Sequence, residues 1–147
     1  MTSWKIERLE KLCTIHTGGT PSRQNPEYFL GNIPWITTVA LGPLHIDEKK
    51  AAAFLTDEAV QGSAAKIIPP SSLLVGIRVG VGKTSINDCE IATNQDIAAL
   101  TNIDDRCDID YLQRVLRNYR SYFDLIKRGA TIQGITTEVL RQLDIPL

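Results

Sequence analysis

Residues 72–87 constrain the fold most, because they join an apolar run to a second, more polar run through closely spaced glycines. Residues 72–78 have the pattern of a largely buried strand, and residues 83–86 have the pattern of its partner. The loop between them contains Gly80 and Gly82, and glycine adopts the positive φ angles that hairpin loops require. The sequence therefore predicts a β-hairpin over residues 72–87.

The end of this stretch, Gly82-Lys83-Thr84, also resembles the end of a nucleotide-binding P-loop. A P-loop needs a further glycine five residues before Gly82, and Ile77 occupies that position. The residues after Thr84 are spaced as in a strand, whereas a P-loop opens a helix. The hairpin is therefore the favoured interpretation, and a small nucleotide-binding enzyme that uses Gly82-Lys83-Thr84 is a less favoured alternative.

The predicted register places Arg78 and Lys83 opposite each other across the mouth of the hairpin. Like charges directly opposite on a ladder repel each other, and an anion lying across them would relieve the repulsion. A phosphate of a nucleic-acid backbone is the first anion to consider. The other interpretation is two solvated cations that point apart, because surface like charges are weakly coupled.

Two short segments carry helix signals. Thr56 is a good N-cap for a short helix near residues 57–62, because Asp57 and Glu58 fall in its first turn. Near the end of the chain, Thr136 or Thr137 is expected to cap a last short helix. Both segments therefore predict helices that begin at a threonine.

A longer amphipathic helix is predicted near residues 109–127, with Asp108 as its cap and Gly129 as its end. Its apolar residues recur at spacings of three and four, and they are Ile109, Leu112, Leu116, Tyr119, Phe123 and Ile126. The opposite side carries the basic residues Arg114, Arg117, Arg120 and Arg128. We interpret this side as an ordinary solvated face, because a charged helix face is usually only that.

The length of 147 residues fits a single domain over residues 1–147. The elements together predict an α+β fold, in which an irregular twisted β-rich body carries the hairpin and packs on the longer helix. The formal net charge is −1, from 16 Lys and Arg against 17 Asp and Glu. Overall charge therefore gives no argument for nucleic-acid binding, and any such argument depends on local patches. No apolar run approaches the roughly 18 residues of a membrane span.

The patterns of common catalytic and metal sites are missing from the sequence. The three cysteines have no CxxC spacing, and His16 and His45 lack neighbours with the spacing of metal ligands. No Gly-x-Ser-x-Gly elbow and no dinucleotide-binding turn is found. The sequence therefore predicts a noncatalytic, cytoplasmic binding module with reduced thiols, no metal, no cofactor and no membrane contact.

Several motifs occur in a fixed order along the chain. The opening "WKIERLEKLCTIHTGGTPSRQNPEYFLGNIPWIT" contains a Gly-Gly-Thr-Pro-Ser turn and an Ile-Pro-Trp-Ile segment. Then follow "SAAKIIP", the stretch from Arg78 to Lys83, the pair Asn94-Gln95 and the closing "GATIQGITTEVLRQLDIPL". This order resembles the target recognition domain of the specificity subunit of type I restriction–modification systems. The resemblance covers essentially the whole chain.

The resemblance implies sequence-specific binding of double-stranded DNA, in which one half of a bipartite target is read. It also implies partners: DNA methyltransferase subunits and, through the complex, a restriction subunit, which would supply the methyltransferase, ATPase and nuclease activities. Specificity subunits usually carry two recognition domains joined by spacer helices, and the sequence matches one such domain without a spacer. A homodimer or a tandem second domain would then supply the other half. A fragment of a longer protein and a natural half-subunit both stay open, as does a docking module for a methyltransferase without sequence preference.

Polar and basic residues in the irregular segments are the candidates for contact with DNA. Arg and Lys suit guanine, and Asn and Gln suit adenine, whereas other contacts hold phosphates. The candidates are Thr20, Ser22, Arg23, Gln24, Thr37, Thr38, Arg78, Lys83, Arg128, Thr131 and Gln133. The remaining motif residues are better explained as turn, core and buried amide positions, and they are Gly18, Gly19, Pro21, Trp35, Asn94 and Gln95.

Overall fold

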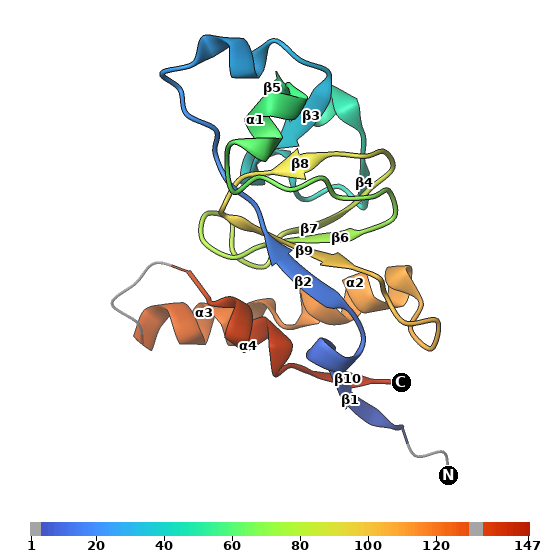
Figure 1. Ribbon diagram of the computed structural model, residues 1–147. Helices are drawn as coiled ribbons and strands as arrows, with labels where there is room; N and C mark the ends of the chain where they lie inside the picture. The colour runs from blue at the N-terminus through green and yellow to red at the C-terminus, as the bar shows by residue number, and fades with distance from the viewer. Residues whose placement is uncertain (1–3, 130–133) are drawn as a thin grey trace.

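The computed structural model describes residues 4–129 and 134–147, and its described strands form three sheets (Figure 1). The large sheet has the strand order β2 (Thr14–Thr17), β9 (Ile97–Thr101), β6 (Leu73–Gly76), β7 (Thr84–Asn87) and β4 (His45–Ile46). The small sheet has the order β5 (Ala53–Leu55), β3 (Ile33–Ile36) and β8 (Ala92–Thr93). Strand β1 (Ile6–Arg8) pairs antiparallel with β10 (Asp144–Pro146).

The α-helices of the described chain are α1 (Asp57–Gln61), α2 (Ile109–Asn118), α3 (Arg120–Gly129) and α4 (Thr137–Arg141). Short 3₁₀ helices span Leu9–Lys11, Pro26–Phe29, Thr38–Ala40 and Glu48–Lys50. In Figure 1, α2, α3 and α4 lie on one side of the large sheet, and the small sheet with α1 lies on the other. The predicted α+β fold is confirmed, and the structure shows it as stacked layers.

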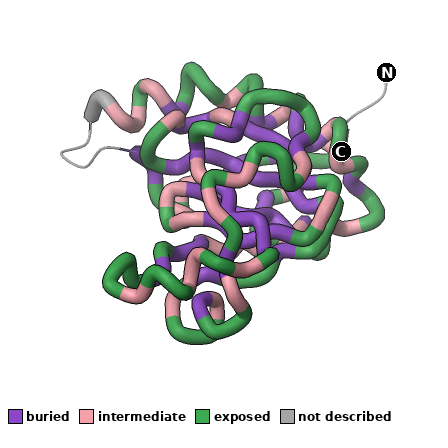
Figure 2. Tube along the Cα trace, turned by 90° about the horizontal axis from the view of Figure 1, so that it is seen from above, coloured by how far each residue is buried: buried purple, intermediate pink, exposed green. Residues whose placement is uncertain are grey.

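Strands β6 and β9 are buried on both faces, which places them at the centre of the layers. Leu73 and Val75 of β6 belong to the core shared with the helices, whereas Leu74 between them belongs to the core shared with the small sheet. Successive side chains of a strand point to opposite faces, so one apolar run fills two cores. Figure 2 shows the buried segments gathered in the interior of the molecule, with exposed segments around them.

The predicted hairpin is confirmed as the antiparallel pair β6 and β7, in which Val75 lies opposite Thr84. However, β6 ends at Gly76, whose N–H donates to the carbonyl of Lys83 over 2.9 Å. Lys83 therefore lies opposite Gly76, and Arg78 lies beyond the paired residues. The prediction that Arg78 and Lys83 face each other is wrong, because the loop between the strands is longer than the sequence indicated.

The predicted helix over residues 109–127 is present, but Tyr119 divides it into α2 and α3. The Tyr119 N–H donates to the Leu116 carbonyl, three residues back, which tightens the last turn of α2. Its hydroxyl donates to the carbonyl of Asp144 over 2.6 Å and so ties the junction to β10. Both helices still bury the predicted apolar face, because Leu116 and Phe123 are fully buried.

The predicted helix caps are confirmed by hydrogen bonds from side chain to backbone. Asp108 accepts from the Tyr111 N–H at the start of α2, and Thr56 accepts from the Ala59 N–H at the start of α1. Thr136, rather than Thr137, caps α4. No helix in the described ranges is long and apolar enough to cross a membrane.

We expect Leu74→Ala to lower the free energy of unfolding by about 2–5 kcal/mol, because it opens a cavity between two packed sheets. Leu74 is fully buried. Urea denaturation measures the change, with Leu125→Ala as the matched control, because Leu125 on α3 is 65% exposed. The control should change stability by no more than about 0.5 kcal/mol. Equal effects of the two substitutions would contradict the central position of β6.

The thiol of Cys13 makes stability sensitive to alkaline pH. Burial, with a smaller contribution from nearby Cys107, raises the pKa of the Cys13 thiol from 9.0 to about 12. The unfolded chain therefore loses this proton at a lower pH than the folded chain, so stability falls as pH rises. The expected loss is about 1.4 kcal/mol per pH unit between pH 9 and the folded pKa.

Urea denaturation at pH 8 and pH 10 should thus show a larger loss of stability for the unchanged chain than for Cys13→Ala. Both proteins share their other titrating groups, so the difference isolates the thiol. An identical pH dependence in the two proteins would contradict the raised pKa.

Candidate nucleic-acid interface

The Gly18-Gly19 turn fits tightly between two other segments. The Gly19 N–H donates to the Thr93 carbonyl over 3.0 Å, and its carbonyl accepts from the indole N–H of Trp35 over 3.1 Å. A Cβ added at Gly18 would overlap with the carbonyl and hydroxyl oxygens of Thr93. A Cβ added at Gly19 would lie 2.7 Å from Cβ of Ala64. Only glycine allows this close approach, which carries the chain out of β2 with Thr20 at the surface.

Residues 94–96, here called the 94–96 turn, are the point where several candidate residues meet. The Thr20 hydroxyl donates to Oε1 of Gln95 over 2.6 Å. Nη1 of Arg78 donates to the carbonyl of Gln95 over 2.7 Å. The turn itself is closed by Asn94, whose side-chain oxygen accepts from the Asp96 N–H over 3.1 Å. Thr20 and Arg78 are 58 residues apart in sequence. The side chain of Gln95 binds Thr20 and its backbone carbonyl binds Arg78, so both lie at this turn.

Two neighbouring strands fix the position of the 94–96 turn. The Asn94 N–H donates to the carbonyl of Ile36 at the end of β3, and the Ile77 N–H donates to the carbonyl of Asp96. In Figure 1 the blue segment after β2, the yellow connection from β8 to β9 and the β6–β7 loop lie on the same side of the molecule. Backbone hydrogen bonds therefore join the loops on this side to neighbouring segments.

Arg78 is held in place by an acidic neighbour and by a returning loop. Its Nη1 lies 3.8 Å from Oδ1 of Asp96, and its side chain is half exposed. The Ile135 N–H donates to the carbonyl of Ile77 over 2.7 Å, which places Gly134 against Arg78. The candidates Thr131 and Gln133 lie outside the described residues, and so does the side chain of Arg128.

Arg23 is exposed and rests on aromatic rings. Its guanidinium carbon lies 5.5 Å from the centre of the Phe29 ring and 5.8 Å from that of Trp35. Such contacts contribute about 0.5–1 kcal/mol at exposed sites and restrict the side chain. Its neighbours Ser22 and Gln24 are also exposed, and the Ser22 hydroxyl accepts from the Gln24 N–H.

The candidates after β3 differ in how far they can reach. Thr37 is half-buried at the end of the strand, whereas Thr38 is only 5% exposed. Thr38 begins a 3₁₀ helix that turns its side chain inward. A base edge needs a side chain at the surface, so Thr38 is a structural residue in this conformation.

Lys83 lies apart from the 94–96 turn, at the other end of the hairpin loop. It lines a small cleft with Thr84, Arg117 and Arg120. Thr84 begins strand β7, so the helix that follows a P-loop is absent here. Its hydroxyl accepts from Nε of Arg117 over 2.9 Å. The Gly82-Lys83-Thr84 segment therefore lacks the helix that would supply a P-loop's phosphate-binding dipole.

The contacts of Gln95 and Arg117 leave no mark in the sequence. The sequence patterns indicate a fold position for Gln95 and a solvated helix face for Arg117 and Arg120. The arginine partners Thr84 and Gly42 are 33 and 75 residues away from Arg117. Regular spacing on a helix marks which residues share a face, and it carries no signal for a partner that distant.

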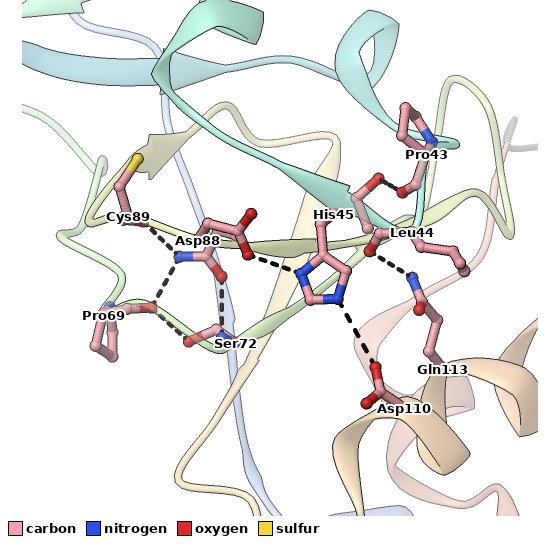
Figure 3. A network of polar contacts seen from close by, with 11 residues as sticks. Pro43, Leu44, His45, Pro69, Ser72, Asp88, Cys89, Asp110 and Gln113 are labelled. Carbon is pink, nitrogen blue, oxygen red and sulfur yellow. Dashed lines mark hydrogen bonds and ion pairs between the residues drawn. The ribbon is translucent and has the colours of Figure 1, made fainter.

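A polar network joins β4 and the residue before it to α2 (Figure 3). Nδ1 of His45 lies 2.7 Å from Oδ1 of Asp88, and its Nε2 lies 3.8 Å from Oδ1 of Asp110 on α2. Gln113 on α2 is buried and donates from Nε2 to the carbonyl of Leu44 over 3.2 Å. These contacts fix the segment before β4 against α2. Within the described ranges, no group of three or more His, Cys, Asp or Glu could hold a metal.

The arrangement of layers is shared with solved specificity subunits. The HsdS subunit from Thermoanaerobacter tengcongensis superposes with a TM-score of 0.72 at 23% identity, covering 98% of this chain and 33% of that one. The S subunit from M. genitalium gives a TM-score of 0.63 at 18% identity, covering 99% and 34%. These likenesses define the fold as that of a type I specificity-subunit domain.

Sequence comparison agrees with the fold. The chain is 25% identical over 146 residues to the type I restriction enzyme MjaIX specificity subunit of Methanocaldococcus jannaschii, covering 97% of this chain and 34% of that protein. It is 27% identical over 153 residues to the EcoR124I/EcoR124II specificity subunit of Escherichia coli, covering 98% and 36%. All of residues 1–147 match the family described as the type I restriction modification DNA specificity domain, and the chain belongs to this family. It spans about a third of the length of these curated relatives.

We expect Gly18→Ala to lower the free energy of unfolding by about 1–3 kcal/mol, because the added methyl group meets backbone and side-chain oxygens of Thr93. The matched control is Gln24→Ala, an exposed position in the same segment, with a change of no more than about 0.5 kcal/mol. Thermal and urea denaturation measure both. An unaltered stability of Gly18→Ala would contradict the close packing of the turn.

Proposed function

We propose that the chain binds double-stranded DNA and reads one half of a bipartite target, as the specificity component of a type I restriction–modification complex. The printed names of its relatives describe specificity subunits of type I restriction enzymes, which supports this role. Residues 1–147 act as one recognition domain without catalytic activity of their own. The protein works in the cytoplasm, where its partners are methyltransferase subunits and, through them, a restriction subunit.

The observation that carries the proposal is the convergence of Thr20 and Arg78 on the 94–96 turn. Gln95 is exposed, and it is fixed through its side chain and its carbonyl. Base reading needs donors and acceptors whose positions are set before DNA arrives. Arg78 presents a planar guanidinium that suits the O6 and N7 atoms of guanine, and Gln95 carries the amide that suits adenine. Arg23 and Thr20 extend this surface along the segment after β2.

The second half of the target requires a second recognition unit. A single module that neutralises a few phosphates binds in the nonspecific range of roughly 10⁻⁴–10⁻⁶ M at physiological salt. A tandem domain or a second copy of the chain would raise the effective concentration of the first unit at its half-site. The partner subunits would hold the two units at a fixed separation.

Selection of bound duplexes from a randomised pool tests the proposal, with and without a methyltransferase subunit. We expect a short half-site to be enriched. Arg78→Lys should relax the preference at one position, by about 1–3 kcal/mol, because Lys keeps the charge and loses the bidentate geometry. Arg106→Lys is the matched control, since Arg106 is an exposed arginine that pairs with Asp104 far from the 94–96 turn.

Three outcomes separate the candidate functions. Enrichment that Arg78→Lys relaxes and Arg106→Lys leaves intact supports base reading at Arg78. Enrichment that neither change alters keeps DNA recognition and excludes Arg78 as a reader. Methyltransferase binding without any enriched sequence would replace the proposal with a docking module.

A further inference from the structure

The cleft beside Lys83 gathers positive charge from the hairpin loop, from α2 and from α3. It has a volume of about 200 Å³. The hairpin loop, the segment before β4 and the junction of α2 and α3 form its walls. Its lining residues, here called the cationic cleft, are Gly42, Gly82, Lys83, Thr84, Arg117 and Arg120.

Arg117 forms a fixed part of the cationic cleft. Its Nε donates to the Thr84 hydroxyl over 2.9 Å, and its Nη2 donates to the carbonyls of Gly42 over 2.6 Å and Thr84 over 3.2 Å. All of these acceptors are neutral, so they orient the guanidinium without cancelling its charge. A guanidinium has five N–H donors, and these contacts use Nε and Nη2.

The aliphatic stems of the other two cations lie beside the glycines of the loop. Gly82 has a φ of +84°, and a Cβ added there would lie 3.4 Å from Cγ of Arg120. A Cβ added at Gly80 would lie 2.8 Å from Cδ of Lys83. The glycines of the loop therefore leave the room into which these two side chains pack.

The three cations of the cationic cleft have no carboxylate beside them within the described residues. Arg78, Arg106 and Arg141 each lie within 4.0 Å of a carboxylate. Within the described residues, no Asp or Glu oxygen lies that close to a charged nitrogen of Lys83, Arg117 or Arg120. Three like charges that line one small cleft repel each other, and a bound anion converts this repulsion into attraction.

We infer that the cationic cleft binds a phosphate group of the DNA backbone. This inference rests on the proposed function and adds a contact that is separate from the base-reading residues. A volume of about 200 Å³ suits a phosphate group, and it lies below the range of roughly 300–1,000 Å³ that is usual for whole small molecules. Among the residues that the structure describes, no aromatic side chain lines the cleft to stack a nucleotide base. The phosphate fixes the position of the duplex, and residues at the 94–96 turn read its bases.

The test compares the salt dependence of duplex binding by the unchanged 147-residue chain and by Lys83→Gln/Arg120→Gln. Arg117 is left intact because it holds β7 against α2. Loss of one phosphate contact should make the slope of log Kobs against log salt shallower by about 0.9. The sequence preference found by selection should stay the same. An unchanged slope in the double variant would overturn the inference.

The matched control is Arg8→Gln/Lys11→Gln, which also removes one arginine and one lysine charge. Both positions are exposed and lie outside the lining of the cleft. This variant should keep the slope of the unchanged chain. An equal loss of slope in both variants would show that only total charge matters, and it would also overturn the inference. Thermal denaturation verifies that both variants are folded.

A second measurement separates the sources of the phosphate and does not depend on DNA binding. Inorganic phosphate, added to ¹⁵N-labelled chain, should shift the amide signals of Gly82, Thr84 and Arg120, and the double variant should lose these shifts. ATP carries more negative charge than inorganic phosphate. Its affinity for the chain should exceed that of inorganic phosphate only by the amount that this extra charge explains. Saturation by micromolar ATP would instead identify a nucleotide site and overturn the assignment to DNA.

The two measurements together distinguish failure of the inference from failure of the proposed function. If the double variant binds DNA with sequence preference and an unchanged salt slope, the cleft is not a phosphate site, and the proposed function still holds. Amide signals that shift with inorganic phosphate, in a chain that binds no duplex, would refute the proposed function. They would also refute DNA as the source of the bound phosphate, and the cleft would be an anion site with a different function.

Discussion

Strands β6 and β9 are buried on both faces, and every other layer packs against one of these faces. A strand in this position has no surface on which a polar side chain can meet a partner. Its residues are apolar or small, as in the run from Leu73 to Val75 and in Ala98 and Ala99. The polar groups that we assign to DNA therefore lie away from these two strands. They occur in loops, at strand ends and on the helices α2 and α3.

The 94–96 turn follows from the same constraint. Strand β8 belongs to the small sheet and β9 to the large one, so the chain crosses between the sheets just after Thr93. Buried backbone groups at such a crossing need hydrogen-bond partners. The Ile36 carbonyl accepts from the Asn94 N–H, and the Gln95 carbonyl accepts from Arg78. The Gly19 N–H donates to the Thr93 carbonyl. A crossing that must be tied to its neighbours thus also brings candidate recognition residues together.

Local features of the fold were predictable from the sequence, and features that depend on distant partners were not. The cap residues Asp108 and Thr56 accept hydrogen bonds from residues three positions further on, and the two hairpin strands lie within fifteen residues of sequence. Local sequence patterns are therefore enough to predict the caps and the hairpin. The break at Tyr119 has no glycine or proline to mark it, because the tyrosine hydroxyl makes its bond to distant Asp144. Arg78 likewise donates a hydrogen bond to the carbonyl of Gln95, which lies outside the hairpin.

Net charge says little about where this protein can hold an anion. At physiological ionic strength, charges act over about 8 Å, so a phosphate responds to the side chains beside it. Arg78 has Asp96 as a neighbour, which weakens its attraction for a phosphate and restricts the orientation of its guanidinium. Orientation is what a base contact needs, whereas a phosphate contact needs uncompensated charge. Arg117 is oriented by neutral acceptors, which do not offset its positive charge. On the function that we propose, the surrounding acceptors thus divide the basic residues into base readers and phosphate ligands, and both kinds occur in one chain with a formal net charge of −1.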